Sequence, residues 1–199
     1  MKKILGILII AATMISSSFA LGLSIGGRGL IGGNIDKIQN ATKTKGEGLV
    51  YGGGAYVNLE VLGGLGVQAE ANFVSNQVGS SENINLVDIP LMLWYNFDVF
   101  DVVSFGLGAG VNFSTITNNV FQDIKNFNTW NTGLAAGANF KVFFNKHFGL
   151  VLGVNGVFDF TKRSNEDIAA DVVNGQDAKF INTERQAVYG TLGAEFRLF

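Results

Sequence analysis

The chain has 199 residues, of which 47% are hydrophobic and only 15% charged, with 27 glycines, one proline and no cysteine. Soluble domains usually carry about a quarter charged residues, yet no internal segment is apolar over the roughly 18 residues that a membrane helix needs. These values favour one membrane β-barrel or one buried all-β domain. They exclude a disulfide framework and a lipid anchor on a cysteine, and the net charge of −2 gives no sign of a nucleic-acid partner.

Residues 1–20 have the pattern of a secretory signal peptide. Lys2 and Lys3 form a cationic start, residues 4–15 are mostly apolar, and Ser18 and Ala20 are small residues at the positions that a signal peptidase reads. A buried helix or an uncleaved anchor is the alternative. We predict cleavage after Ala20, which leaves one domain over residues 21–199 and makes Leu21 the first residue of the exported protein, as mass spectrometry would test.

From residue 21 onward, apolar residues alternate with small or polar ones, with the period of two that is typical of strands. The clearest run is Ile84 to Phe113, which has the pattern of two strands of membrane-spanning length joined by a short turn. The same alternation recurs along the whole chain. It predicts eight strands, over residues 21–31, 49–61, 65–73, 84–97, 103–113, 130–142, 148–160 and 188–198.

The connections between these strands alternate between long and short. Long polar segments cover residues 35–47, 75–83, 115–129 and 161–186, and the segment 168–173 is expected to form a brief helix. Short turns fall at 63–64, 98–102 and 144–147. The pattern predicts an all-β fold: an eight-stranded antiparallel up-and-down transmembrane β-barrel with short periplasmic turns and four longer extracellular loops.

Each predicted strand has one apolar face and one face of small, polar or charged residues. A charge that faces lipid at the bilayer centre costs roughly 2–4 kcal/mol, so the apolar face should meet lipid. An eight-stranded barrel is just wide enough to be filled by side chains, and we expect its inner charges to pair in a structural network. Arg28 is expected near Glu195 or near the neighbours of Arg197 on the last strand, and Lys141 is expected to pair with an acid on a flanking strand. The predicted lumen charges are Arg28, Glu60, Glu70, Asp88, Lys141, Asp159, Glu195 and Arg197.

Uncharged residues also divide between the two faces. Pro90 and Trp94 are expected to point into the barrel, as Asp88 does, with a bulge or kink at Pro90. Leu30, Val50, Val74 and Leu86 are expected to give the lumen an apolar layer near the loop end. Outward aromatic residues gather near both strand ends, as in the two girdles at membrane interfaces. These are Tyr95, Phe97, Phe105, Phe140, Phe148 and Phe196 towards the turns, and Tyr51, Phe73, Phe113, Trp130, Phe158 and Phe160 towards the loops.

Three segments carry a family resemblance: GVQAEANF (66–73), VDIPLMLWYNF (87–97) and FGLGAGVNF (105–113). With the strand pattern, they make the chain similar to small eight-stranded barrels of the OmpA, OmpX and OmpW kind, and more closely to the outer membrane protein β-barrel domain family. The resemblance implies the outer membrane of a diderm bacterium and insertion by the barrel assembly machinery. One departure is that Phe199 shares its strand parity with Arg197 and Glu195, so a bulge near the end or an imperfect assembly signal is expected.

Catalytic and cofactor-binding patterns are missing from the sequence. The one histidine, His147, falls in a predicted turn, and there is no cysteine, no metal-ligand cluster and no G-x-S-x-G element. The glycine-rich runs at 26–29 and 52–54 lie within strand patterns and precede no helix, so they do not indicate phosphate loops. We therefore predict a protein without enzymatic activity, cofactor or metal.

Three functions fit a small barrel. The first is a monomeric structural or surface-interaction scaffold that contacts an extracellular ligand through residues 35–47, 115–129 and 161–186, with lipid around its wall. The second, which the OmpW likeness suggests, is a narrow channel for small hydrophobic compounds. The third is a soluble lipocalin-like carrier, which would need a charged exterior that these strands lack. We predict the first.

Overall fold

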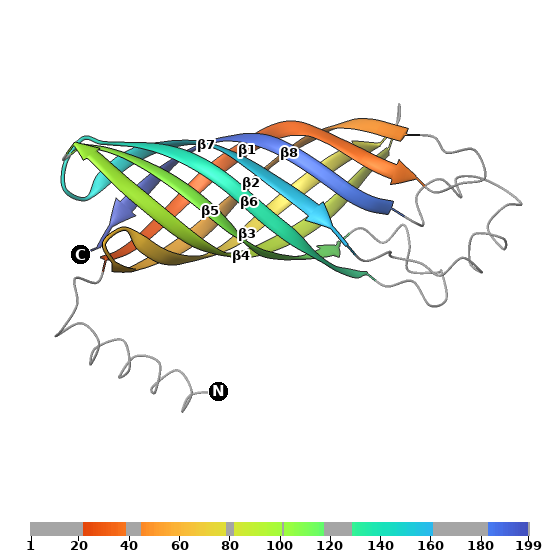
Figure 1. Ribbon diagram of the computed structural model, residues 1–199. Coiled ribbons are helices and arrows are strands. Elements are labelled where there is room, and N and C mark those ends of the chain that lie inside the picture. Colours follow the sequence, from red (N-terminus) through yellow and green to blue (C-terminus); the bar gives the residue numbers. More distant parts are fainter. Residues whose placement is uncertain are drawn as a thin grey trace, which may run out of the picture.

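The computed structural model describes residues 22–38, 45–78, 82–100, 102–117, 129–160 and 183–198. They form one closed antiparallel barrel in which every strand is hydrogen-bonded to its neighbours in sequence and the first pairs with the last (Figure 1). The predicted fold class is confirmed. The strands are β1 (Gly22–Ile38), β2 (Lys45–Leu62), β3 (Leu65–Val78), β4 (Glu82–Phe100), β5 (Val103–Ile116), β6 (Trp130–Phe143), β7 (Phe148–Asp159) and β8 (Thr183–Arg197).

The described part of the chain contains no helix that is both long and apolar enough to cross a membrane.

The strands are staggered around the barrel, which tilts them relative to its axis (Figure 1). Opposite residues can be followed from strand to strand, and the path that leaves β1 at Ser24 returns to it at Asn34, ten residues further along. Between these two points the path runs through Asn58, Gln68, Met92, Gly110, Ala135, Val157 and Ala187. All of its members are inward-facing, so this register sets which side chains meet in the lumen.

The alternation predicted from the sequence separates an apolar outer wall from a filled interior. On β4, the neighbouring residues Leu93 and Trp94 are 61% and 1% exposed. The outward aromatic residues lie near both ends of the strands as expected. At the turn end, Tyr95 packs edge-on against Phe97, and Phe105 packs against Phe140 with the two rings tilted. The outer wall therefore has the apolar surface and aromatic borders that a bilayer requires.

The interior also contains two apolar clusters. Met92, Trp94 and Ala135 form one of them. The predicted apolar residues Leu30, Val50, Val74 and Leu86 are all at most 5% exposed. Three of them belong to the larger cluster, which comprises Leu30, Val50, Val74, Val157, Ala187 and Tyr189.

Several strands extend further than predicted, and the predicted loops are correspondingly shorter. β1 continues to Ile38 and β2 begins at Lys45, so the proposed loop 35–47 is partly strand. β3 continues to Val78, β4 to Phe100 and β5 to Ile116, and β8 begins at Thr183. Backbone pairing does not need apolar side chains, so a barrel can continue beyond its lipid-facing band with polar residues. The predicted signal peptide and the brief helix at 168–173 lie outside the described residues.

A bulge or kink was predicted at Pro90, and of these the bulge is wrong. Between β3 and β4, Ala69 is opposite Leu91 and Asn72 is opposite Asp88. These two pairs are three residues apart on both strands, so neither strand has an extra residue and the register is unchanged. Pro90 stays opposite Asn112 on β5. It lacks only the backbone N–H group that would donate to β3, the other neighbour of β4. The register shifts of these strands lie next to turns, between Glu60 and Leu62 and between Asp98 and Phe100.

Two large aromatic side chains lie across neighbouring strands, over glycines. A Cβ atom on Gly26 would lie 2.2 Å from Cζ of Tyr56, whose ring crosses β1 on the inner side. Trp94 occupies the corresponding space over Gly108, where a Cβ would lie 2.4 Å from its ring. By contrast, a Cβ on the outward-facing Gly27 would meet only the carbonyl oxygen of Gly54, at 3.8 Å.

Adjacent glycines should therefore respond differently to the same substitution. We predict that Gly26→Val lowers the free energy of unfolding by about 1–3 kcal/mol, because the new side chain must displace Tyr56 from a packed interior. Gly27→Val should leave stability unchanged or raise it. Urea unfolding of the two variants in detergent micelles measures the difference. Equal effects would contradict the placement of Tyr56.

Candidate functional site

The eight charged residues predicted to line the lumen all lie on the inner face of the wall. Glu70, Asp88, Lys141, Asp159 and Glu195 are buried. Arg28, Glu60 and Arg197 are partly buried. Six of them divide by their ion pairs into three groups, at the middle, near the turn end and at the loop end of the barrel, and Glu60 and Arg197 lie at the turn-end mouth.

The central group is built around Glu70 on β3. Arg28 of β1 forms an ion pair with Glu70 through Nη2 and Oε2. The amide nitrogens of Gln68 and Asn72 donate to Glu70 at 2.6 and 3.0 Å. Asn155 on β7, with its amide oxygen facing the guanidinium, accepts from Arg28 at 2.8 and 2.9 Å. The Glu70 carboxylate is thus held by the side-chain donors of Arg28, Gln68 and Asn72. A charge that is buried away from water requires such partners.

The second group lies near the turn end. Lys141 of β6 donates to Oε2 of Glu195 on β8 at 2.7 Å, and the hydroxyl of Tyr56 donates to the same oxygen at 2.8 Å. Tyr56 reaches Glu195 by crossing β1 over Gly26. It also lies beneath Arg28, whose Cζ is 5.7 Å from the centre of the tyrosine ring.

Both ion-pair partners predicted from the sequence are wrong. Arg28 was expected near Glu195 but pairs with Glu70, and Lys141 pairs with an acid two strands away instead of on a flanking strand. The register explains this outcome. Glu195 lies opposite Gly26, two residues nearer the turn end than Arg28, and the narrow lumen allows a lysine to span the strand between.

The third group lies at the loop end and contains a cation that the sequence did not reveal. Arg185 of β8 donates through Nη2 to Oδ1 of Asp88 at 2.7 Å, and its Nε lies 3.7 Å from Oδ2 of Asp159. Asn131 donates to Asp159 at 3.0 Å. Arg185 was assigned to the loop 161–186, although it shares the parity of the inward residues Ala187, Tyr189 and Thr191, and this alternation would have identified it.

The remaining two charges, Glu60 and Arg197, lie at the turn-end mouth of the lumen. The guanidinium of Arg197 lies over the ring of Phe143, 3.5 Å from its centre, and Asn96 donates to Glu60 at 3.4 Å. A cavity of about 30 Å³ lies here, with Ser24, Asn58 and Lys141 also on its wall. Its volume corresponds to about one water molecule.

The end of β8 keeps its register, so the bulge considered near the C-terminus is not needed within the described residues. Pairing with β1 is continuous from Thr183 to Arg197. Leu198 is exposed, on the parity of Leu192 and Phe196. Phe199 lies outside the described residues.

His147 lies in an exposed turn, as expected. Its Nδ1 is 2.9 Å from the carbonyl oxygen of Arg197, and its ring stacks on Phe196. Among the described residues, no three histidine or acidic side chains lie close enough together to hold a metal ion. These contacts give His147 a role in joining the β6–β7 turn to the end of β8.

An apolar exterior with two aromatic borders and a closed, hydrogen-bonded wall around paired charges defines the class of integral membrane β-barrels. The family of the chain follows from its sequence. The model of the outer membrane protein beta-barrel domain matches residues 5–197, and the chain belongs to this family of outer-membrane proteins.

Solved structures show the same fold. Neisserial surface protein A (NspA) is similar with a TM-score of 0.61 and 11% identity, over 87% of this chain and 96% of that one. The outer membrane protein OprG from Pseudomonas aeruginosa is similar with a TM-score of 0.56 and 18% identity, over 89% and 95%. A search of curated proteins gave no match.

Removing Arg185 should strongly destabilise the barrel. Arg185→Met leaves two buried carboxylates without their shared cation, and loss of one partner from a buried ion pair costs about 3–5 kcal/mol. We expect that loss in urea unfolding followed by tryptophan fluorescence. The triple variant with Asp88→Asn and Asp159→Asn should recover most of it, because no buried charge is then left alone. A triple variant as unstable as the single one would contradict the ion-pair account.

Proposed function

We propose that the protein is a non-enzymatic outer-membrane scaffold whose lumen is closed and whose function is carried by its extracellular loops. The observation that carries the proposal is the filling of the lumen. Buried ion pairs occupy it near the turn end, at the middle and near the loop end, and an apolar cluster packs between them. A small barrel filled in this way is suited to holding loops in place more than to passing solutes.

The loops supply the interaction surface in this proposal. The short turns at 63–64 and 144–147 lie at one end of the barrel, and β1, β3, β5 and β7 end at the opposite end (Figure 1). By the general rule for such barrels, the short-turn end faces the periplasm. Residues 39–44, 118–128 and 161–182, which remain of the predicted loops after the strand extensions, would then contact an extracellular ligand. Export through cleavage after Ala20 and insertion by the barrel assembly machinery belong to the same proposal.

Passage of small hydrophobic compounds is the second candidate, and the apolar cluster at the loop end is the observation in its favour. The six members of that cluster are at most 5% exposed, so a solute would have to separate them. Each neighbouring pair of described strands is also hydrogen-bonded, although the pairing of β3 with β4 is interrupted beside Pro90, so the described wall gives a solute little room for a sideways exit. The exposed leucines and phenylalanines of the outer wall weigh against a soluble carrier.

The proposal predicts that purified protein in planar lipid bilayers shows little or no steady conductance, because ions would have to break buried ion pairs to pass. The triple variant Arg185→Met, Asp88→Asn, Asp159→Asn serves as a control, since it removes charge without widening the lumen. Large, steady conductance by the wild type would contradict closure.

On whole cells, added protease should cut within 161–182, and protection of that segment would contradict the proposed orientation.

A further inference from the structure

The lipid-facing wall contains a row of small residues that lie directly opposite one another on four consecutive strands. Gly27 of β1 is opposite Ala194 of β8 on one side and Ala55 of β2 on the other, and Ala55 is opposite Ala71 of β3. Neighbouring strands are about 4.8 Å apart, so the row is roughly 15 Å long. We call the hollow along Ala194, Gly27, Ala55 and Ala71 the trough.

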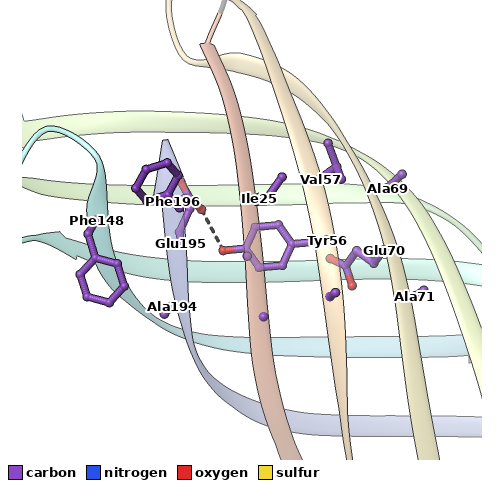
Figure 2. Close-up of a pocket in the computed structure, with 13 residues that line it drawn as sticks. Ile25, Tyr56, Val57, Ala69, Glu70, Ala71, Phe148, Ala194, Glu195 and Phe196 are labelled. Carbon is purple, nitrogen blue, oxygen red and sulfur yellow. Dashed lines mark hydrogen bonds between the residues drawn. The ribbon is translucent and has the colours of Figure 1, made fainter. Parts of the chain in front are cut away.

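Larger side chains border the trough on the short-turn side and at its β8 end, and give it depth there. Phe148, Phe196, Ile25 and Val57 form the neighbouring row on the side of the short turns (Figure 2). At the β8 end, Leu150 is opposite Ala194. The resulting groove has a volume of about 660 Å³, within the range of roughly 300–1,000 Å³ that is usual for small-molecule sites.

Packing within the chain does not explain why these residues are small. An inward-facing glycine such as Gly26 is required, because a Cβ there would overlap Tyr56. A Cβ on Gly27 would approach nothing closer than 3.8 Å, and the outward-facing Gly29 and Gly53 next to the trough would approach nothing closer than 3.9 and 3.5 Å. The wall could carry larger side chains here, as it does elsewhere, so the hollow is open to an external occupant.

The direction in which the trough runs, and the cation at its outer end, indicate an occupant that has an acyl chain and an anionic head group. Ala194 lies three residues from the turn end of β8, whereas Ala55 lies seven residues from the turn end of β2, so the trough runs from the short-turn border into the membrane. At its outer end, the exposed turn residues Lys146 and His147 precede Phe148, and the His147 ring stacks on Phe196. A cation at the level of the aromatic girdle lies where lipid phosphates are found.

We propose that the trough is a phospholipid-binding site, in which one acyl chain of a periplasmic-leaflet lipid lies along Ala194, Gly27, Ala55 and Ala71. The phosphate of the same lipid contacts Lys146 and His147. The site goes beyond the scaffold role and depends on it only through the orientation of the barrel. The lumen contributes no net attraction, because Glu70 and Glu195 behind this part of the wall are paired with Arg28 and Lys141.

The test counts lipids that remain bound to the purified protein. The protein is reconstituted in vesicles of phosphatidylethanolamine and phosphatidylglycerol, extracted in mild detergent and examined by native mass spectrometry. Gly27→Leu with Ala55→Leu fills the trough. The matched control is Ala109→Leu with Ala136→Leu, an opposed pair of small residues on the outer face of β5 and β6. Lys146→Gln removes the charge, and circular dichroism confirms folding of each variant.

The wild type and the control pair should each retain one phospholipid. The trough-filled variant should retain about tenfold less, because the added side chains displace the acyl chain and remove its van der Waals contacts with the wall, and Lys146→Gln should lower retention as well. Equal retention by the wild type and the trough-filled variant would overturn the site. A lipid-free dimer that dissociates on filling the trough would overturn it in favour of a second copy. Either result leaves the conductance measurement, and so the proposed closure, unaffected.

Discussion

The structure depends on one constraint: in the hydrocarbon core of a membrane, every backbone N–H and C=O group must find a partner within the protein. A sheet satisfies this requirement only if it has no free edge, and here β1 closes the sheet by pairing with β8 from Ser24 to Ile38. Closure fixes the stagger of ten residues. The stagger then determines which side chain stands opposite which, both inside the barrel and on its wall. The lumen network and the trough are two consequences of the same register.

Inside the barrel, the register places each of the paired cations next to an acidic side chain of another strand. The cations Arg28, Lys141 and Arg185 come from β1, β6 and β8, and their acids come from β3, β4, β7 and β8. Apart from Arg185 with Asp159, which joins the neighbouring strands β8 and β7, each pair connects strands that are not hydrogen-bonded to each other. A one-residue slip of any strand would turn these charges towards lipid. Buried ion pairs contribute little net stability over an apolar core. We infer that their main effect is to penalise every register but one.

The fold could be predicted from the sequence because alternation is a local property. The face of Leu93 and the face of Trp94 follow from their neighbours alone, as do the aromatic borders and the even number of strands. The partners could not be predicted, because they depend on a stagger to which all eight strands contribute. Arg28 and Glu195 lie on adjacent strands and yet pair with other residues. Arg185 was missed because the first residues of β8 are polar and have the composition of a loop. The trough was missed because the sequence alone does not show that Gly27 lies opposite Ala55.

The most direct test of the account combines gel mobility with membrane extraction. A closed barrel held by eight hydrogen-bonded seams should remain folded in sodium dodecyl sulfate without heating, migrate as a compact band and shift to its full apparent mass on boiling. The same protein should stay in the membrane pellet after washing with alkaline carbonate and high salt. Release by either wash, with no shift on boiling, would contradict a lipid-embedded barrel.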